Sequence, residues 1–99
     1  MIAPATKKLT AKAIAVAMKK LDGWQRVGDT ISKTYKFADY HHSMAFVNAT
    51  AWISHREDHH PDIELGYNKC KVVYSTHSVG GLSINDFVCA AKIDALFTL

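Results

Sequence analysis

The chain has 99 residues, of which 48% are hydrophobic, 21% charged and 10% aromatic, with only five Gly and two Pro. This composition excludes a disordered, collagen-like or low-complexity polypeptide. Because two separate cores would each be too small to be stable, the length predicts one domain over residues 1–99. The sequence has no apolar run near the roughly 18 residues of a membrane span and no secretion signal at its N-terminus. We therefore expect a cytoplasmic protein that does not contact membranes.

The net charge of +3 reflects lysines near the start of the chain rather than a dense basic stripe mixed with aromatic residues. This pattern is typical of a solvated helix face, so we expect no nucleic-acid partner. Cys70 and Cys89 are too sparse for a disulfide scaffold, and we expect both thiols to be reduced. The more unusual feature is the six histidines, of which four fall in one stretch, namely His55, His59, His60 and His77.

The first part of the chain predicts a helix followed by a hairpin. Apolar residues recur at helical spacing over residues 11–21, and Thr10 is a suitable N-cap for this helix. Residues 24–37 alternate between two pleat faces and contain the turn sequence Gly28-Asp29. This combination is typical of a β-hairpin.

A longer helix is expected over residues 40–56, with Asp39 as its N-cap. Its apolar side chains form two stripes on nearly opposite sides. The stripes are Tyr40, Met44, Val47 and Ala51, and Phe46, Ala49 and Ile53. One stripe can cover a sheet, whereas the second needs a partner because a small monomer normally turns a polar helix face to water. We therefore expect a homo-oligomer, a dimer or a tetramer, joined in part through Phe46 and Ile53.

The last part of the chain repeats the hairpin and the helix. Residues 62–76 contain two β-rich runs joined by a turn. Ser83 and Asp86 form a capping signature that opens a helix over residues 84–97. The element order is therefore αββαββα. Hairpins joined by helices favour an α+β fold with a four-stranded antiparallel sheet and three helices packed on one face.

The histidine stretch is the main candidate for chemistry. Pro61 disfavours a helical conformation at His60, so the second helix ends before it and the chain turns there. His77 follows the fourth strand, and Asp86 lies at the start of the last helix. In a fold of this size, these element ends can converge at one rim of the sheet, where imidazoles and a carboxylate would share a cleft.

The residues alone leave three interpretations of this cluster open. His55 and His59 have the i, i+4 spacing of a helical metal site, but the sulfur or carboxylate partners usual for zinc are missing. General acid–base catalysis suits histidine because its pKa lies near neutrality. The third interpretation makes the histidines surface and capping groups, with Asp86 completing a capping box. The pair Gly80-Gly81 lacks the lysine of a phosphate-binding loop and is interpreted as a turn.

A set of motifs at fixed spacing extends from His55 to Asp86. The motifs are His55-x3-His59-His60-Pro61, Tyr67-Asn68, Ser75-Thr76-His77, Gly80-Gly81-Leu82 and Asp86, with looser matches at Gly23-Trp24 and Phe37-x-Asp39-Tyr40. Together they resemble the pterin-4a-carbinolamine dehydratase family. The resemblance implies the same αββαββα fold and the dehydration of a 4a-hydroxytetrahydropterin to the quinonoid dihydropterin. That reaction restores the cofactor of aromatic amino acid hydroxylases, and the resemblance implies no metal or organic cofactor.

The resemblance also implies roles for single residues. The implied catalytic residues are His59, His60, His77 and Asp86, and the implied substrate-binding residues are His55, Pro61, Ser75 and Thr76. Within the first group, His59 and His77 would supply and remove protons. His60 would bind the edge of the pterin, and Asp86 would orient an imidazole by accepting its N–H.

Two positions depart from the pattern that the resemblance implies. His55 stands where many relatives have Glu, and Ile63 stands where many have Trp, so the chain lacks a carboxylate and an aromatic wall at these positions. Glu57 lies at a different position of the motif and does not replace the missing Glu. Some members of the family are also dimerisation partners of transcription factors and act through helix surfaces. A protein-binding module of this kind is the alternative function.

Overall fold

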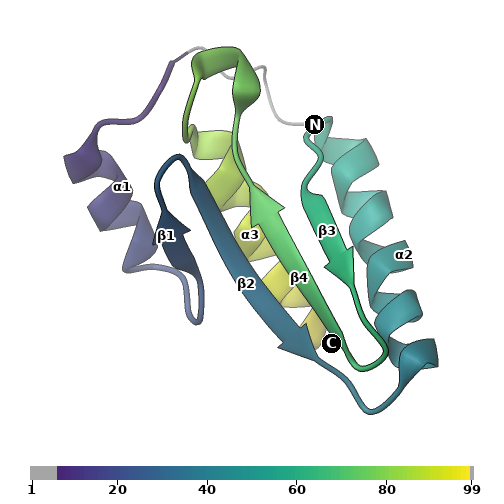
Figure 1. Cartoon of the computed structure of the whole chain (residues 1–99). Coiled ribbons are helices and arrows are strands. Elements are labelled where there is room, and N and C mark those ends of the chain that lie inside the picture. The colour runs from purple at the N-terminus through teal and green to yellow at the C-terminus, as the bar shows by residue number, and fades with distance from the viewer. Residues whose placement is uncertain (1–6, 99) are drawn as a thin grey trace.

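The computed structural model describes residues 7–98. Its helices and strands follow the predicted order (Figure 1). They are α1 (Ala11–Met18), β1 (Gln25–Val27), β2 (Thr30–Lys36), α2 (Tyr40–Glu57), β3 (Asp62–Leu65), β4 (Lys69–Tyr74), the short 3₁₀ helix η1 (His77–Val79), α3 (Ile84–Ala95) and the 3₁₀ helix η2 (Leu96–Thr98).

The four strands form one antiparallel sheet in the order β1-β2-β4-β3. The central pair, β2 and β4, runs from Ile31 opposite Tyr74 to Lys36 opposite Lys69. Three helices lie on one face of this sheet, with α3 behind the two central strands in the view of Figure 1. The predicted α+β fold is therefore confirmed.

The three helices have N-caps at the positions that the sequence predicted. The hydroxyl of Thr10 accepts the N–H of Ala13, and the carboxylate of Asp39 accepts the N–H of His42. Ser83 opens α3 with a complete capping box. Each cap satisfies backbone donors that the first helical turn leaves without intrahelical partners. The helix starts are thus encoded locally, and α3 begins directly beside the end of η1.

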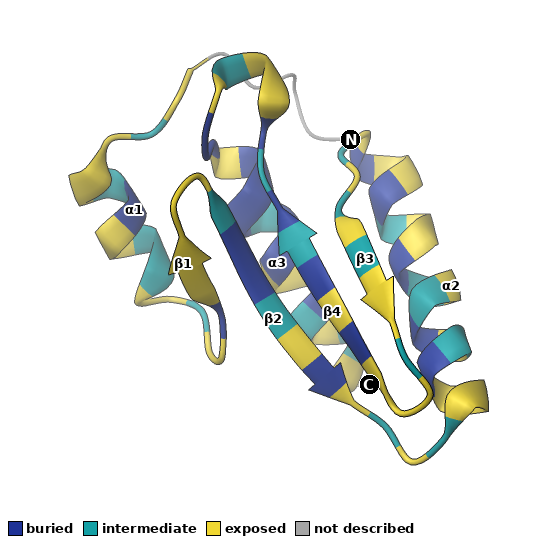
Figure 2. Cartoon of the chain, viewed as in Figure 1, coloured by how far each residue is buried: buried dark blue, intermediate teal, exposed yellow. Residues whose placement is uncertain are grey.

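Burial alternates along the central strands, as Figure 2 shows. In β4, Cys70, Val72 and Tyr74 are fully buried, whereas Lys71 is exposed. Because successive side chains of a strand point to opposite faces, this alternation places one face of the sheet against the helices. The last buried position, Tyr74, lies at the end of the strand from which the candidate site begins.

The predicted orientation of α2 is wrong. Phe46 is only 6% exposed and belongs to the core, whereas Trp52 is 71% exposed. The buried face of the helix consists mainly of polar residues, namely Ser43, Thr50, Ser54 and Glu57 together with Phe46. Small hydroxyl side chains are buried here because each donates to a main-chain carbonyl. An oligomer contact through Phe46 is therefore excluded, because this ring is occupied within the subunit.

Near the C-terminal end of α3, Asp94 joins this helix to β2 and to Trp24, the residue before β1. Its carboxylate accepts hydrogen bonds from Trp24 Nε1 at 3.0 Å, Lys33 Nζ at 3.0 Å and the Tyr35 hydroxyl at 2.5 Å. Burial, reinforced by the hydrogen bond to Asp94, raises the pKa of Tyr35 far above its ordinary value. The phenol is thus a permanent donor, and this Asp94 cluster fixes the C-terminal half of α3 to the sheet.

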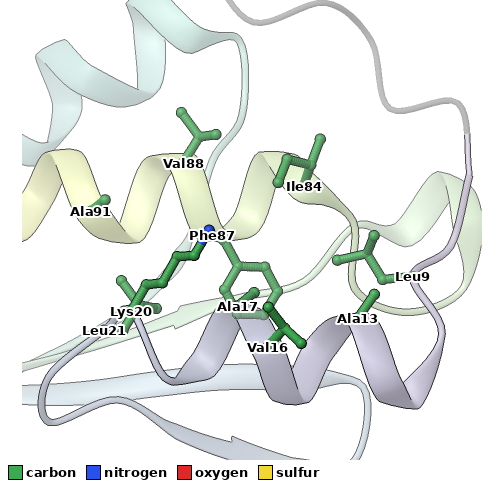
Figure 3. Close-up of a pocket in the computed structure, with 10 residues that line it drawn as sticks. All are labelled: Leu9, Ala13, Val16, Ala17, Lys20, Leu21, Ile84, Phe87, Val88 and Ala91. Atoms are coloured by element: carbon green, nitrogen blue, oxygen red, sulfur yellow. The ribbon is translucent and has the colours of Figure 1, made fainter.

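An apolar groove of about 500 Å³ lies between α1 and α3 (Figure 3). Its walls include Val16 from α1 and Ile84, Phe87 and Val88 from α3, with Lys20 at the rim. None of the site residues expected from the sequence lines this groove. Within residues 7–98, no helix combines the length and apolar character needed to cross a membrane.

Candidate active site

The end of α2 determines where His59 lies. Asp58 follows the helix in the left-handed conformation, with a φ of 51°, and its N–H donates to the carbonyl of His55. The N–H of His59 donates to the carbonyl of Ser54 at 3.1 Å. These bonds close the last helical turn. Because the left-handed residue takes His59 off the helix, the i, i+4 arrangement with His55 that a helical metal site requires is not formed.

Asp86 is the centre of the candidate site. It lies in the first turn of α3 and is fully buried. Its carboxylate oxygens contact His59 Nε2 at 2.6 Å, the Thr76 hydroxyl at 2.8 Å and the Ser83 backbone N–H at 2.9 Å. The hydroxyls of Thr76 and Ser83 are 2.8 Å apart. The helix N-terminus also favours negative charge at this position. The loop after α2, the end of β4 and the start of α3 therefore converge on one carboxylate.

The imidazole of His59 is held on two sides. Besides the contact with Asp86, its ring stacks on Tyr74 with centroids 5.4 Å apart and an interplanar angle of 16°. The His59 side chain is 12% exposed. A carboxylate has no proton to donate, so Nε2 is the donor to Asp86, and Nδ1 is the nitrogen available to a ligand. A partly accessible imidazole with a fixed tautomer is suited to general acid–base chemistry.

His60 and His77 flank this cluster in sequence, and both are exposed. His77 begins η1, directly after Thr76. The N–H of Thr76 donates to the carbonyl of Gly81 at 2.8 Å, and Gly80 adopts the left-handed conformation with a φ of 67°. This closed loop holds His77 beside the residue that contacts Asp86. The Gly80-Gly81 pair is a turn, as the sequence predicted.

The other expected site residues differ in their surroundings. Pro61 and Ser75 are partly buried. Pro61 is two residues after His59, and Ser75 is the residue before Thr76. His55 is exposed on α2 and lines an open hollow that contains none of the Asp86 contacts. The other residues that line this hollow are Asn48, Ala51 and Trp52. The structure thus brings together His59, Thr76 and Asp86, and it does not join His55 to them.

Glu57 has a different role from the carboxylate that the family pattern places at position 55. It is 6% exposed, and its carboxylate lies 2.6 Å from Lys92 Nζ. This ion pair fixes the end of α2 to α3, immediately before the turn that carries His59. Among residues 7–98, no group of three or more His, Cys, Asp or Glu side chains is arranged to hold a metal ion.

Sequence reasoning missed two members of the site. Ser83 was interpreted only as a helix cap, although its hydroxyl also contacts Thr76, and Tyr74 was interpreted only as a strand residue. The spacing of Ser83 three residues before Asp86 is a signal both for the helix cap and for a hydroxyl in the candidate site. No sequence pattern indicates the stacking of Tyr74 on His59, because it depends on how the turn after α2 lies over the end of β4.

Comparison with known proteins supports one family. The family model described as pterin 4 alpha carbinolamine dehydratase matches residues 7–96. A protein of Nitrosospira multiformis, described as a candidate pterin-4-alpha-carbinolamine dehydratase, is 62% identical over 91 residues, which cover 92% of this chain and 80% of that protein. A protein of Chromobacterium violaceum with the same description is 52% identical over 89 residues, which cover 90% of this chain and 82% of that protein.

Two solved structures are also similar. A transcriptional coactivator/pterin dehydratase from Brucella melitensis has a TM-score of 0.86 and 33% identity, covering 90% of this chain and 97% of that chain. A pterin dehydratase-like protein described as a RuBisCO assembly factor in the alpha-carboxysome has a TM-score of 0.61 and 26% identity. The match covers 74% of this chain and 84% of that chain. With a family match over residues 7–96, the chain belongs to the pterin 4 alpha carbinolamine dehydratase family.

Proposed function

We propose that the protein is a dehydratase that converts 4a-hydroxytetrahydropterin to the quinonoid dihydropterin and so recycles the cofactor of aromatic amino acid hydroxylases. The observation that carries this proposal is the contact of His59 with the buried Asp86, which also accepts from Thr76. Family membership supplies the substrate class. The reaction breaks the bond between C4a and the hydroxyl oxygen, which leaves as water after receiving a proton. The adjacent ring nitrogen loses its proton as the new carbon–nitrogen double bond forms.

In this proposal His59 acts through Nδ1. When that nitrogen is protonated it can donate to the departing hydroxyl, and when it is neutral it can accept the proton of the ring nitrogen. Asp86 stabilises the imidazolium by accepting a hydrogen bond from Nε2–H, with the two heavy atoms 2.6 Å apart. The exposed imidazole of His77, next to Thr76, supplies the second proton-transfer group.

The substrate would lie over the exposed side of this cluster. We assign His60 to the edge of the pterin, and we assign Pro61 and Ser75 to its binding because both lie beside residues of the cluster in the chain. His55 keeps a binding role only through the resemblance, since it lines the separate hollow on α2. The chemistry needs no metal or organic cofactor, and a cytoplasmic location fits the supply of a hydroxylase product.

The test is a stopped-flow dehydration assay with chemically generated 4a-hydroxytetrahydropterin. We expect the wild-type protein to accelerate dehydration, and His59→Ala and His77→Ala each to lower the catalysed rate by about 10²-fold to 10⁴-fold. His41→Ala is the matched control because His41 is exposed in the first turn of α2, outside the Asp86 contacts. No acceleration by the wild-type protein, or wild-type rates in both variants, would refute the proposal.

A protein-binding function is the second candidate, and the exposure of α2 favours it. Trp52 is 71% exposed and Tyr40 is 50% exposed on this helix. Large exposed aromatic side chains are enriched at protein interfaces. A homo-oligomer or another partner would therefore use this outer face, since Phe46 is in the core. Light scattering of Trp52→Ser against the wild type tests self-association: a lower mass supports the homo-oligomer, and a monomeric wild-type protein contradicts it.

A further inference from the structure

Tyr74 is the last residue of β4 and has no exposed surface. Its ring lies nearly parallel to that of His59, with the centroids 5.4 Å apart, and it also contacts Trp24 at 6.4 Å in the core. One edge of this phenol therefore belongs to the core and one face belongs to the candidate site. Tyr74 is also two residues before Thr76, the hydroxyl that contacts Asp86.

The hydroxyl of Tyr74 gives no structural reason for a tyrosine here. It is buried beside Ser54 and Cys89 but makes no hydrogen bond of good geometry with any residue in the range 7–98. Burial raises the pKa of Tyr74 well above its ordinary value, so the phenol is neutral at physiological pH. What the side chain contributes to its surroundings is the aromatic ring.

The ring supplies a restraint that Asp86 cannot provide alone. A single hydrogen bond from Nε2 fixes one atom of the imidazole but still allows the ring to rotate about the line joining Nε2 to the carboxylate oxygen. A parallel aromatic face blocks this rotation because a tilted imidazole would collide with it. The two contacts together fix both the position of the His59 ring and the direction in which Nδ1 points.

We propose that Tyr74 is a positioning residue that sets the plane of the His59 imidazole and thereby aims Nδ1 at the substrate. The proposal rests on the proposed function for its effect on rate, whereas the restraint itself is a property of the free protein. A residue that acts in this way lowers kcat when it is removed and leaves KM nearly unchanged, because it does not contact the substrate.

The experiment compares three variants with the wild type. Tyr74→Phe keeps the ring and removes the hydroxyl, and Tyr74→Leu removes the ring while keeping an apolar core residue. Val72→Ala is the matched control, since Val72 is a fully buried residue of the same strand and its truncation destabilises the core without touching His59. The free proteins are first checked for folding by circular dichroism.

The first readout is NMR relaxation of the His59 ring C–H groups, which reports how far the plane of the imidazole moves. We expect a rigid His59 ring in the wild type, Tyr74→Phe and Val72→Ala, and a more mobile His59 ring in Tyr74→Leu. The second readout is dehydration, for which we expect kcat to fall about tenfold in Tyr74→Leu only. A His59 ring as rigid in folded Tyr74→Leu as in the wild type, or the same loss of rigidity in Val72→Ala, would overturn the proposal. If the wild type does not catalyse dehydration, the proposed function fails, and the NMR comparison still decides the role of Tyr74.

Discussion

Helix α3 carries two carboxylates that look alike in their contacts and differ in what they can do. Asp86 in its first turn and Asp94 in its last turn each accept three hydrogen bonds from other parts of the chain. Asp86 is fully buried, whereas the Asp94 side chain is 26% exposed. The number of hydrogen bonds therefore does not explain why only one of the two lies in a candidate active site.

The difference lies in the donors. The donors to Asp94 are an indole N–H, an ammonium group and a phenol. One donor to Asp86 is the imidazole of His59, whose second ring nitrogen is available to a ligand. We therefore expect the Asp86 contacts to serve catalysis and the Asp94 contacts to serve stability, because only the first set includes an imidazole.

The largest difference between the two carboxylates is expected when each is replaced with its amide. Asp86→Asn places an N–H donor among groups that donate, so the preferred tautomer of His59 is lost and the catalysed dehydration rate should fall by about 10²-fold or more. Asp94→Asn should change the rate by less than about twofold, because its partners lie away from His59. Stopped-flow rates of the two variants provide the measurement. Equal losses of activity in both would show that the two clusters do not differ as described.

The Asp94 cluster should instead dominate stability. Asp94→Ala leaves Trp24, Lys33 and Tyr35 without their shared acceptor, and we expect the free energy of unfolding to fall by about 2 kcal/mol. Urea unfolding followed by circular dichroism measures this change. Lys71→Ala is the control, since Lys71 forms only an exposed ion pair with Glu64. A loss for Asp94→Ala no larger than that of the control would contradict this role.

A smaller effect is expected from the hydroxyl that supports Asp86. Thr76→Val removes one donor to the carboxylate and the contact with Ser83. A charge-assisted hydrogen bond of this kind corresponds to about a tenfold change in rate. Thr34→Val, at an exposed position of β2, is the matched control. The dehydration assay should show the loss only in Thr76→Val, and an unchanged rate there would mean that the Thr76 hydroxyl is not needed to position Asp86.

The smallest effect concerns the thiols. Cys89 lies on α3 between the two carboxylates, and burial raises the pKa of its thiol to about 11. Burial also raises the pKa of Cys70. Because a raised pKa favours the protonated thiol, the reactive thiolate is scarce at pH 8 and increases only as the pH approaches 11. Iodoacetamide should modify the native protein at pH 8 much more slowly than the urea-unfolded chain, and equal rates in a mass-spectrometric time course would refute this.

Local signals in the sequence were sufficient for the element order and the helix starts. Thr10, Asp39 and Ser83 cap the helices they were predicted to cap, because a cap depends on residues two or three positions away. The orientation of α2 was wrong because pattern reasoning treats Thr50 and Ser54 as surface residues. Their hydroxyls donate to carbonyls of the preceding helical turn, so they enter the core at little cost.

The contacts of the two carboxylates on α3 differ in how far they could be predicted. Family resemblance indicated His59, Thr76 and Asp86, and the structure brings these three together across 27 residues of sequence. The Asp94 cluster joins residues 59 to 70 positions apart and has no local signal. Contacts of this kind depend on the packing of α3 against the sheet, which composition and periodicity do not specify.

The central claim is that Asp86 acts on the reaction through His59, and a double-mutant cycle on the dehydration rate tests it most directly. The cycle compares the wild type, His59→Ala, Asp86→Asn and the double variant. If Asp86 acts by holding the imidazole, adding Asp86→Asn to His59→Ala should lower the remaining rate by less than about threefold. If the two losses instead multiply, so that the double variant is slower than His59→Ala by the full factor of Asp86→Asn, the two residues act independently and the account is contradicted.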